Sequence, residues 1–293
     1  MPTKIEKDSV TGTETTGHEW DGLRELNTPL PKWWLYTWFV CIAFAGVWCF
    51  LYPSFPIPFT GTYWHGVLGA STRAGVERDL RAVAAQRAGV MDRVASQPYD
   101  KIRADPELME AAMTAGRITF ANNCQACHGA GGAGAIGYPA LAAGAWIWGG
   151  KLSDIEKSIT VGARNGSPSA HATIMPKFGD GILKPAEIEQ VADYVMTFYG
   201  NPRAGVAEAD IAAGGALFAT NCAACHGTKG EGNRLLGAPR LASKVHLYGS
   251  SRAIVVQQMN NPRLGAMPAW GPRLDKATIK SVALYVHDLG GGE

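Results

Sequence analysis

The chain contains two copies of one segment, and this internal repeat constrains its fold more than any other feature. Residues 116–129, GRITFANNCQACHG, match residues 214–227, GGALFATNCAACHG. Each copy is followed by Pro-x-Leu, an aromatic residue with glycine, Met-Pro and an amphipathic segment, 185–200 or 276–289. A repeat of this length indicates two copies of one small structural unit, and the helical periodicity of its apolar residues predicts an all-α fold.

Within each copy, a glycine, an aromatic residue and the first cysteine are spaced four residues apart. This spacing places the glycine and the aromatic ring on one face of a helix, where the missing side chain lets a second helix cross closely. We therefore expect tightly crossed helices in each copy. The residues are Gly116, Phe120 and Cys124 in the first copy and Gly214, Phe218 and Cys222 in the second.

Each copy carries Cys-x-x-Cys-His, the pattern of covalent attachment of c-type haem. Two thiols three residues apart can both form thioethers with one porphyrin, and the adjacent histidine then lies beside the iron. The sequence predicts two covalently bound haem c groups. The attachment residues are Cys124 and Cys127 in the first copy and Cys222 and Cys225 in the second, with His128 and His226 as iron ligands.

Two other functions of a Cys-x-x-Cys pair fit this sequence less well. A thioredoxin-like redox centre needs a βαβ context, whereas these motifs lie between helical segments rich in glycine and alanine. A structural zinc site would have to combine both pairs, and the separation of Cys127 from Cys222 far exceeds the usual spacing of zinc ligands. Cys41 and Cys49 lie in an apolar run, so no disulfide framework is expected.

The second axial ligand of each iron is expected to be a methionine, which raises the reduction potential of a histidine-ligated haem. Met175 and Met267 each precede proline and are followed by an aromatic residue and glycine at matching repeat positions. Taken in chain order, Met175 is expected to bind the iron at His128, and Met267 the iron at His226.

Other residues could supply these ligands. His171 lies in a loop that is longer in the first copy and is the chief alternative to Met175. Met259 and His246 are the alternatives to Met267.

Residues 33–52, WWLYTWFVCIAFAGVWCFLY, are uncharged and apolar, with aromatic residues at both ends. Twenty residues of helix span a hydrocarbon layer of ~30 Å, and aromatic residues favour its two interfaces. A cleaved signal peptide would have a shorter apolar region near a basic N-terminus, but 32 residues with six acidic side chains come first. We predict one uncleaved transmembrane helix.

The basic residues flanking this helix predict its orientation. Arg24 and Lys32 precede it, and no basic residue follows it before Arg73, so the N-terminus is expected on the cytoplasmic side. The expected order is a cytoplasmic segment (1–32), the transmembrane helix (33–52), a periplasmic linker with an amphipathic helix (53–106) and two haem domains (107–200 and 201–293). The formal net charge of +2 gives no support to nucleic-acid binding.

Residues 18–34, HEWDGLRELNTPLPKWW, resemble the start of the di-haem subunit (subunit III, CcoP family) of cbb3-type cytochrome c oxidases. Residues 69–73 and 146–150 look like further elements of that family. The resemblance implies one N-terminal transmembrane helix followed by two tandem class I cytochrome c domains with histidine and methionine ligands. Two positions depart from the family pattern: His246 stands where tryptophan is common, and Ala70 where tyrosine is common.

The resemblance also implies a function. The family relays electrons from a cytochrome c donor to the mono-haem subunit and then to the catalytic haem-copper subunit, which reduces oxygen and pumps protons. The expected location is the bacterial inner membrane. The chain is not expected to be an enzyme by itself, because a haem-copper site needs several membrane helices bearing histidines, and the predicted span contains none. The alternatives are a free-standing di-haem shuttle and a di-haem peroxidase with an open iron site.

Overall fold

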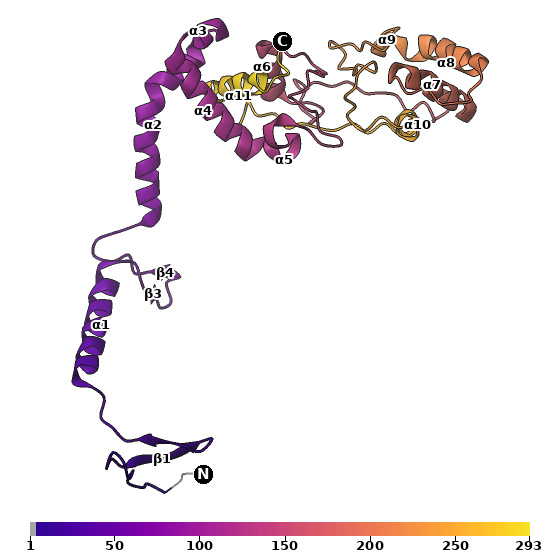
Figure 1. The fold of residues 1–293 in the computed structure, drawn as a ribbon. Helices are drawn as coiled ribbons and strands as arrows, with labels where there is room; N and C mark the ends of the chain where they lie inside the picture. Colours follow the sequence, from indigo (N-terminus) through magenta and orange to yellow (C-terminus); the bar gives the residue numbers. More distant parts are fainter. Residues whose placement is uncertain (1–3) are drawn as a thin grey trace. The chain divides into compact units, whose positions relative to one another are not determined.

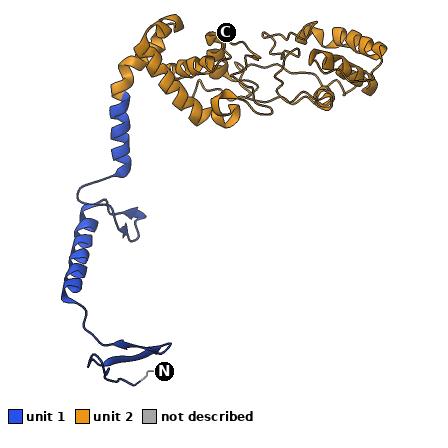
Figure 2. Cartoon of the chain, viewed as in Figure 1, with its two compact units in different colours: residues 1–84 blue, residues 85–293 orange. Residues whose placement is uncertain are grey.

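The computed structural model describes residues 4–293 and is mostly helical, with two compact units divided after residue 84 (Figures 1 and 2). The elements in chain order are β1 (Thr15–Trp20), β2 (Leu23–Leu26), α1 (Lys32–Leu51), β3 (Pro56–Ile57), β4 (Thr62–Tyr63), α2 (Thr72–Ser96), α3 (Tyr99–Ala104), α4 (Pro106–Asn123), α5 (Gln125–His128), the 3-10 turn η1 (Ala130–Gly132), α6 (Leu152–Val161), α7 (Pro185–Phe198), α8 (Glu208–Asn221), α9 (Ala223–His226), α10 (Arg252–Asn260) and α11 (Lys276–Asp288).

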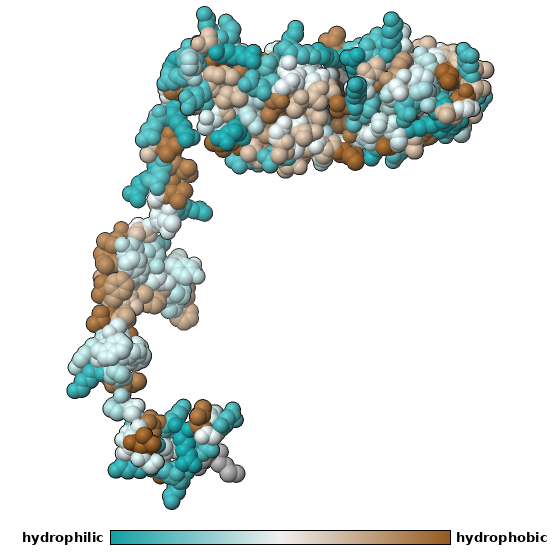
Figure 3. All heavy atoms as spheres, in the orientation of Figure 1, coloured by the Kyte–Doolittle hydropathy of each residue, from teal (hydrophilic) through white to brown (hydrophobic). Residues whose placement is uncertain are grey.

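Helix α1 is the apolar helix expected from the sequence. It begins after Pro31, has 20 residues with a mean hydropathy of 1.8, and contains no buried residue. Figure 3 shows apolar side chains at the surface of this helix. Among the described residues it is the one helix long and apolar enough to cross a membrane, so the predicted single span is confirmed as a helix, shifted by one residue.

Two small hairpins flank α1 in the first unit. Strands β1 and β2 pair antiparallel across Asp21 and Gly22, which both have positive φ (51° and 86°). An Asp-Gly pair with this geometry forms the tight turn that matches the twist of the paired strands. Strands β3 and β4 pair after the helix. These hairpins are the exception to the expected all-α class.

Helix α2 corresponds to the amphipathic segment predicted in the linker. Towards its C-terminal end Val94 is fully buried, in a cluster with Ile102 and Leu108 of the following helices. The ammonium of Lys280 donates to the carbonyl of Val94 (3.4 Å) and to other carbonyls at this helix end, and a positive charge stabilises the C-terminus of a helix. The apolar residue Leu80, nearer the N-terminus, remains exposed.

The second unit is built around two helix crossings. Each crossing pairs a helix of the first repeat with a helix of the second. Helix α4 of the first repeat packs against α11 of the second, and α8 of the second repeat packs against α7 of the first. Each repeat's first helix is therefore covered by the closing helix of the other repeat.

The two repeat glycines lie at these crossings, as their spacing predicts. A Cβ on Gly116 would lie 2.2 Å from the carbonyl oxygen of Ser281, and a Cβ on Gly214 would lie 2.1 Å from that of Gln190. Since no side chain fits at such distances, glycine is required at both positions. The aromatic pairs beside the glycines are Phe120 with Tyr285 and Phe218 with Tyr194.

The two crossings form two modules, one built from a single continuous segment of the chain and one from two separate segments. The contiguous module comprises residues 172–263, with α7 to α10 around a core that includes Val191, Phe218 and Met259. The split module comprises residues 85–171 and 264–293, with α3 to α6 and α11. Its core includes Phe120, Ile155 and Val282.

The connection between α7 and α8 explains this arrangement. Only residues 199–207 separate the two helices, and helices joined by a short loop pack most readily against each other as an antiparallel pair. The domain boundary predicted at residue 200 lies in this connection between α7 and α8. Chain order and spatial order differ in this unit.

Candidate haem sites

Each Cys-x-x-Cys-His motif follows the C-terminal end of a long helix and forms one further helical turn. In both motifs the backbone N–H of the histidine donates to the carbonyl oxygen of the first cysteine at 2.9 Å, from His128 to Cys124 and from His226 to Cys222. One turn of helix brings both thiols and the imidazole to the same place. The long helix positions that turn, because the N–H of each first cysteine donates to the phenylalanine carbonyl one turn earlier.

The Pro-x-Leu segments fix the orientation of the two histidine rings. Nδ1 of His128 lies 3.0 Å from the carbonyl oxygen of Pro139, and Nδ1 of His226 lies 3.0 Å from that of Pro239. A carbonyl only accepts hydrogen bonds, so Nδ1 donates and the neutral ring keeps a lone pair on Nε2. Burial lowers the pKa of His226, which favours the neutral ring that a metal requires.

The first thiol of each motif is uncharged in this environment. Burial, and to a smaller extent the neighbouring cysteine, raises the pKa of the Cys124 and Cys222 thiols to about 11. Zinc binding and thiol nucleophiles need the opposite shift, towards thiolate. Neutral sulfur in an apolar pocket is compatible with thioether attachment of a porphyrin.

No alternative metal site is formed in the described part of the chain. Residues 4–293 contain no group of three or more His, Cys, Asp or Glu side chains placed to hold a metal ion. The two cysteine pairs lie in different modules, one beside the Phe120 core and one beside the Phe218 core. The zinc alternative therefore lacks its ligand cluster.

A cavity of about 270 Å³ lies beside the second motif and is lined mostly by residues of the contiguous module. Cys222, Cys225 and His226 form part of its wall, and Met175 lies in another part. Most of the remaining lining residues are apolar, such as Val195. In a c-type haem site, two thiols attach the porphyrin covalently, and an imidazole nitrogen and a thioether sulfur can coordinate the iron. Apolar walls surround the ring. The residues present therefore fit haem c.

The structure places the two repeat methionines differently from the expectation based on chain order. Met175 lines the cavity of the second motif with His226, and Met267 packs in the split-module core beside Cys124 of the first motif. The expected pairs, His128 with Met175 and His226 with Met267, are not brought together. The physical reason is the exchange of closing helices, since each methionine precedes its closing helix in the chain and moves with it.

The other candidate ligands are also located. His171 has its Nε2 3.1 Å from the hydroxyl oxygen of Ser158 and its ring stacked on Trp148 at 4.2 Å between centroids. Met259 and His246 both line the cavity of the contiguous module. The first of these two is a buried core residue with 4% exposure.

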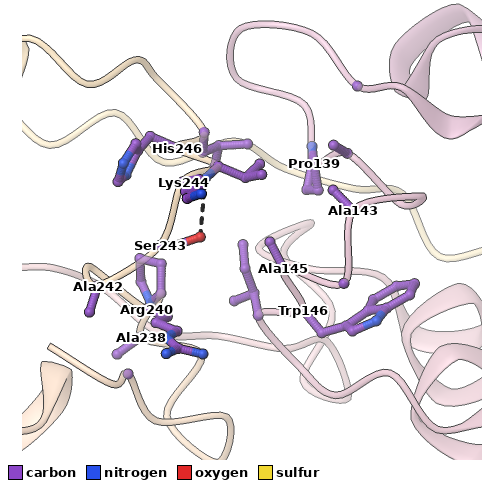
Figure 4. Close-up of a pocket in the computed structure, with 18 of the residues that line it drawn as sticks. Pro139, Ala143, Ala145, Trp146, Ala238, Arg240, Ala242, Ser243, Lys244 and His246 are labelled. Carbon is purple, nitrogen blue, oxygen red and sulfur yellow. Dashed lines mark hydrogen bonds between the residues drawn. The ribbon is translucent and has the colours of Figure 1, made fainter. Parts of the chain in front are cut away.

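A second, larger cavity of about 940 Å³ lies between the loops that follow the two motifs (Figure 4). Pro139 and Pro239, which accept hydrogen bonds from the two histidine rings, both line it. Small side chains such as Ala143 and Ala145 leave the space open. The loops that hold the two histidines therefore face one common cavity.

Arg240 lines both the 270 Å³ cavity and the 940 Å³ cavity. It is not among the site residues predicted from the sequence. It is the middle residue of the second Pro-x-Leu segment, where the first copy has Ala140. A comparison of the variable position within the repeated segment is the signal that could have found it. Its guanidinium brings positive charge to the walls of both cavities.

Comparisons with known proteins agree along the whole chain. Residues 12–58 match the family model described as the N-terminal domain of cytochrome oxidase-cbb3, FixP. Residues 113–198 match the cytochrome c model, and residues 209–286 match the model for cytochrome c oxidase, cbb3-type, subunit III.

Relatives of full length are similar to this chain. It is 46% identical over 295 residues to the cbb3-type cytochrome c oxidase subunit FixP of Bradyrhizobium sp. (strain ORS 278), covering 100% of both chains. It is 46% identical to subunit CcoP of Azospirillum sp. (strain B510) over 98% of both chains, and 42% identical to CcoP of Cereibacter sphaeroides over 100% of both. The chain therefore belongs to the FixP/CcoP family, subunit III of cbb3-type cytochrome c oxidases, which are electron-transfer subunits of the cytochrome c type.

Proposed function

We propose that this chain carries two covalent haem c groups and relays electrons from a cytochrome c donor to the mono-haem and catalytic subunits of a cbb3-type oxidase. The observation that carries the proposal is the second motif, where two thiols, an oriented imidazole and a thioether line one apolar cavity. The same histidine-to-proline hydrogen bond at the first motif supports a second site of the same kind. Haem, when bound, supplies a one-electron iron couple.

The chain's own residues hold that couple with little rearrangement. The carbonyls of Pro139 and Pro239 keep each imidazole in one tautomer and one orientation. The thioethers at Cys124, Cys127, Cys222 and Cys225 would fix the macrocycle, and the apolar cavity walls exclude water, which tunes the reduction potential. In this proposal the chain transfers electrons only, and oxygen reduction takes place in the catalytic subunit.

The membrane arrangement follows from the charges beside α1. We infer that the chain spans the bacterial inner membrane once, with residues 1–32 in the cytoplasm and the two modules in the periplasm, because Arg24 and Lys32 lie at the N-terminal end of the helix. A periplasmic position gives a cytochrome c donor access to the modules.

Purification of the native protein tests the proposal. We expect the chain to co-purify with b-type haem and copper, and mass spectrometry to find two haem additions on the peptides that contain Cys124 and Cys222. Rapid mixing with a reduced cytochrome c should reduce both c-type haems before oxygen is consumed.

The same preparation can refute each part of the proposal. A chain without haem additions would exclude the electron-transfer role. A di-haem chain that purifies without b-type haem and copper would indicate a free-standing shuttle. High-spin c-type haem that binds carbon monoxide and turns over peroxide would indicate a peroxidase.

A further inference from the structure

The aromatic-glycine pair of each repeat has no part in the haem attachment described above. The pairs are Trp148-Gly149 and Tyr248-Gly249, and each lies shortly before a helix, α6 or α10. Both glycines have the same left-handed backbone, with φ of 106° and 109°. Side chains are disfavoured at such φ values, so the chain turns in the same way at both places. Both aromatic rings are partly buried.

The ring of Trp148, in the split module, reaches a loop of the contiguous module. A Cβ built on Gly237 of that loop would overlap the six-membered part of the indole. The same indole stacks on His171 of its own module, with 4.2 Å between the ring centroids and 11° between the planes. Trp148 is therefore held by its own module and rests against a glycine of the other.

The ring of Tyr248, in the contiguous module, makes the reverse contact. A Cβ built on Gly137 of the split module would lie 3.5 Å from Cε1 of Tyr248. The N–H of Gly137 also donates to the carbonyl of Leu247 at 2.7 Å. The tyrosine hydroxyl accepts a hydrogen bond from the N–H of Gly265, again in the split module, at 3.1 Å. The contacts between the modules are therefore reciprocal.

The two glycines occupy equivalent positions in the loops that orient the motif histidines. Gly137 and Gly237 each lie two residues before the proline whose carbonyl accepts the imidazole hydrogen bond, Pro139 or Pro239. At the base of each loop, the leucine of the Pro-x-Leu segment donates its N–H to a glycine carbonyl, at 2.7 Å in the first repeat and 2.8 Å in the second. A ring that presses on the glycine therefore limits the movement of the proline carbonyl and of the imidazole bonded to it.

We propose that Trp148 and Tyr248 are positioning residues that couple the two haem sites. Each acts from its own module on the loop that orients the histidine of the other module. The residues before the two rings, Ile147 and Leu247, line the common cavity between these loops. Electron exchange between two cofactors depends on how the protein positions them, so the two rings support the exchange between the haems. The inference rests on the function proposed above.

The contact of Trp148 should be the stronger of the two. A Cβ on Gly237 has no room beside the indole, whereas a Cβ on Gly137 would be at an ordinary van der Waals distance from Tyr248. Loss of the Trp148 ring should therefore disturb the second site more than loss of the Tyr248 ring disturbs the first.

Trp148→Ala and Tyr248→Ala in the full-length, haem-loaded chain test the coupling. The electron paramagnetic resonance (EPR) signal of each ferric haem reports the orientation of its imidazole, and hydrogen exchange read by mass spectrometry reports each loop separately. Single-haem chains, in which both cysteines of one motif are changed to serine, assign the two EPR signals. Flash reduction of one haem then measures electron exchange between the two.

The coupling predicts a crossed result. Trp148→Ala should broaden the EPR signal of the haem at His226 and speed hydrogen exchange in residues 230–241, with smaller changes at His128. Tyr248→Ala should do the reverse, with a smaller effect. Electron exchange between the haems should slow in both variants. Changes that are larger in the module carrying the substituted ring would overturn the coupling.

Two further variants separate positioning from a general loss of packing. Trp148→Phe should restore the EPR signal of the haem at His226, because a phenyl ring can still rest on Gly237. Trp146→Phe is the matched control, since the indole N–H of Trp146 donates to the carbonyl of Gly291 within the split module. Broadening of the His226 signal by Trp146→Phe as large as that by Trp148→Ala would also overturn the coupling.

Gly237→Ala approaches the same contact from the other module. Its Cβ meets the indole, so the variant should lower the midpoint of urea unfolding, and Trp148→Ala in the same chain should recover part of that loss. Absence of any recovery would show that the two residues do not press on each other and would overturn the coupling. This measurement does not need haem. A chain without covalent haem would instead refute the proposed function, while the recovery would still establish the contact.

Discussion

The contiguous and split modules use equivalent pieces in a different chain order. In the contiguous module the crossed helices α7 and α8 are neighbours along the chain, whereas in the split module α4 and α11 are separated by the whole contiguous module. The entropy of closing a loop grows only slowly with its length, so this difference alters the stability of the helix pairs little. It alters the order of folding more, because distant contacts form slowly.

The two modules also differ in what surrounds their closing helices. The split module has an additional cluster in which Ala277 and Leu284 of α11 meet Val94 and Ile102. In the contiguous module the closing helix carries the buried Asp193, which accepts hydrogen bonds from Arg252 at 2.6 and 2.9 Å. Within the split module, the C-terminal helix α11 is therefore the element that packs against the end of α2.

Removal of residues 264–293 should have the largest effect. The split module would lose Met267 and α11, whose buried Ile279, Val282, Leu284 and Val286 contribute about 1.5–3 kcal/mol each. That loss is comparable to the whole stability of a domain, about 5–15 kcal/mol. Limited proteolysis should digest the first motif and spare the second, which serves as the internal control. Equal protection of both motifs would contradict the division into these modules.

Alanine at the repeat glycines should have an intermediate effect. Gly116→Ala and Gly214→Ala each force the crossed helices apart, with an expected cost of about 1–3 kcal/mol. Hydrogen exchange should show α11 loosening in the first variant and α7 in the second. Gly89→Ala on α2 is the control, because a Cβ there meets no atom within 4 Å. Loosening of α7 by Gly116→Ala would show that α4 crosses its own repeat's closing helix.

The smallest expected effect is on the loss of folding stability at acid pH. Each module has one histidine whose ring stacks on an aromatic side chain. Burial lowers the pKa of His171 on Trp148 and of His246 on Tyr199. Because the folded state favours the neutral rings, both contribute stability above the unfolded pKa of about 6.5, and this stability is lost as the pH falls below it.

Urea unfolding followed at each module between pH 7.5 and 5 checks this prediction. His171→Gln should reduce the acid-induced loss in the split module, and His246→Trp should reduce it in the contiguous module. Equal pH dependence in the variants and the unaltered chain would show that other groups govern acid sensitivity.

Much of this molecule could be predicted from local sequence. The apolar run, the repeat, the glycine crossings and the turn that carries Cys124, Cys127 and His128 depend on spacing within one helix or loop, which the sequence displays directly. The Asp21-Gly22 pair, with positive φ at both residues, is likewise a local signal for the β1–β2 turn.

The pairing of methionines with motifs could not be predicted in the same way. Both repeats supply the same parts, so a sequential and an exchanged assembly satisfy the same pattern of apolar residues, glycines and ligands. The deciding feature is the connection of residues 199–207, which is short enough to favour an α7–α8 pair. Met175 and Met267 then follow the closing helices to which they are attached.

The divided path of the split module has a consequence for biogenesis. Cys124 emerges early during synthesis and translocation, whereas residues 264–293 follow only after the whole contiguous module, and domains that are contiguous in the chain close as soon as their segment has emerged. The first motif would therefore remain in an unfolded segment of the chain while the contiguous module around the second motif is already folded. Premature termination near the C-terminus would harm the site encoded first.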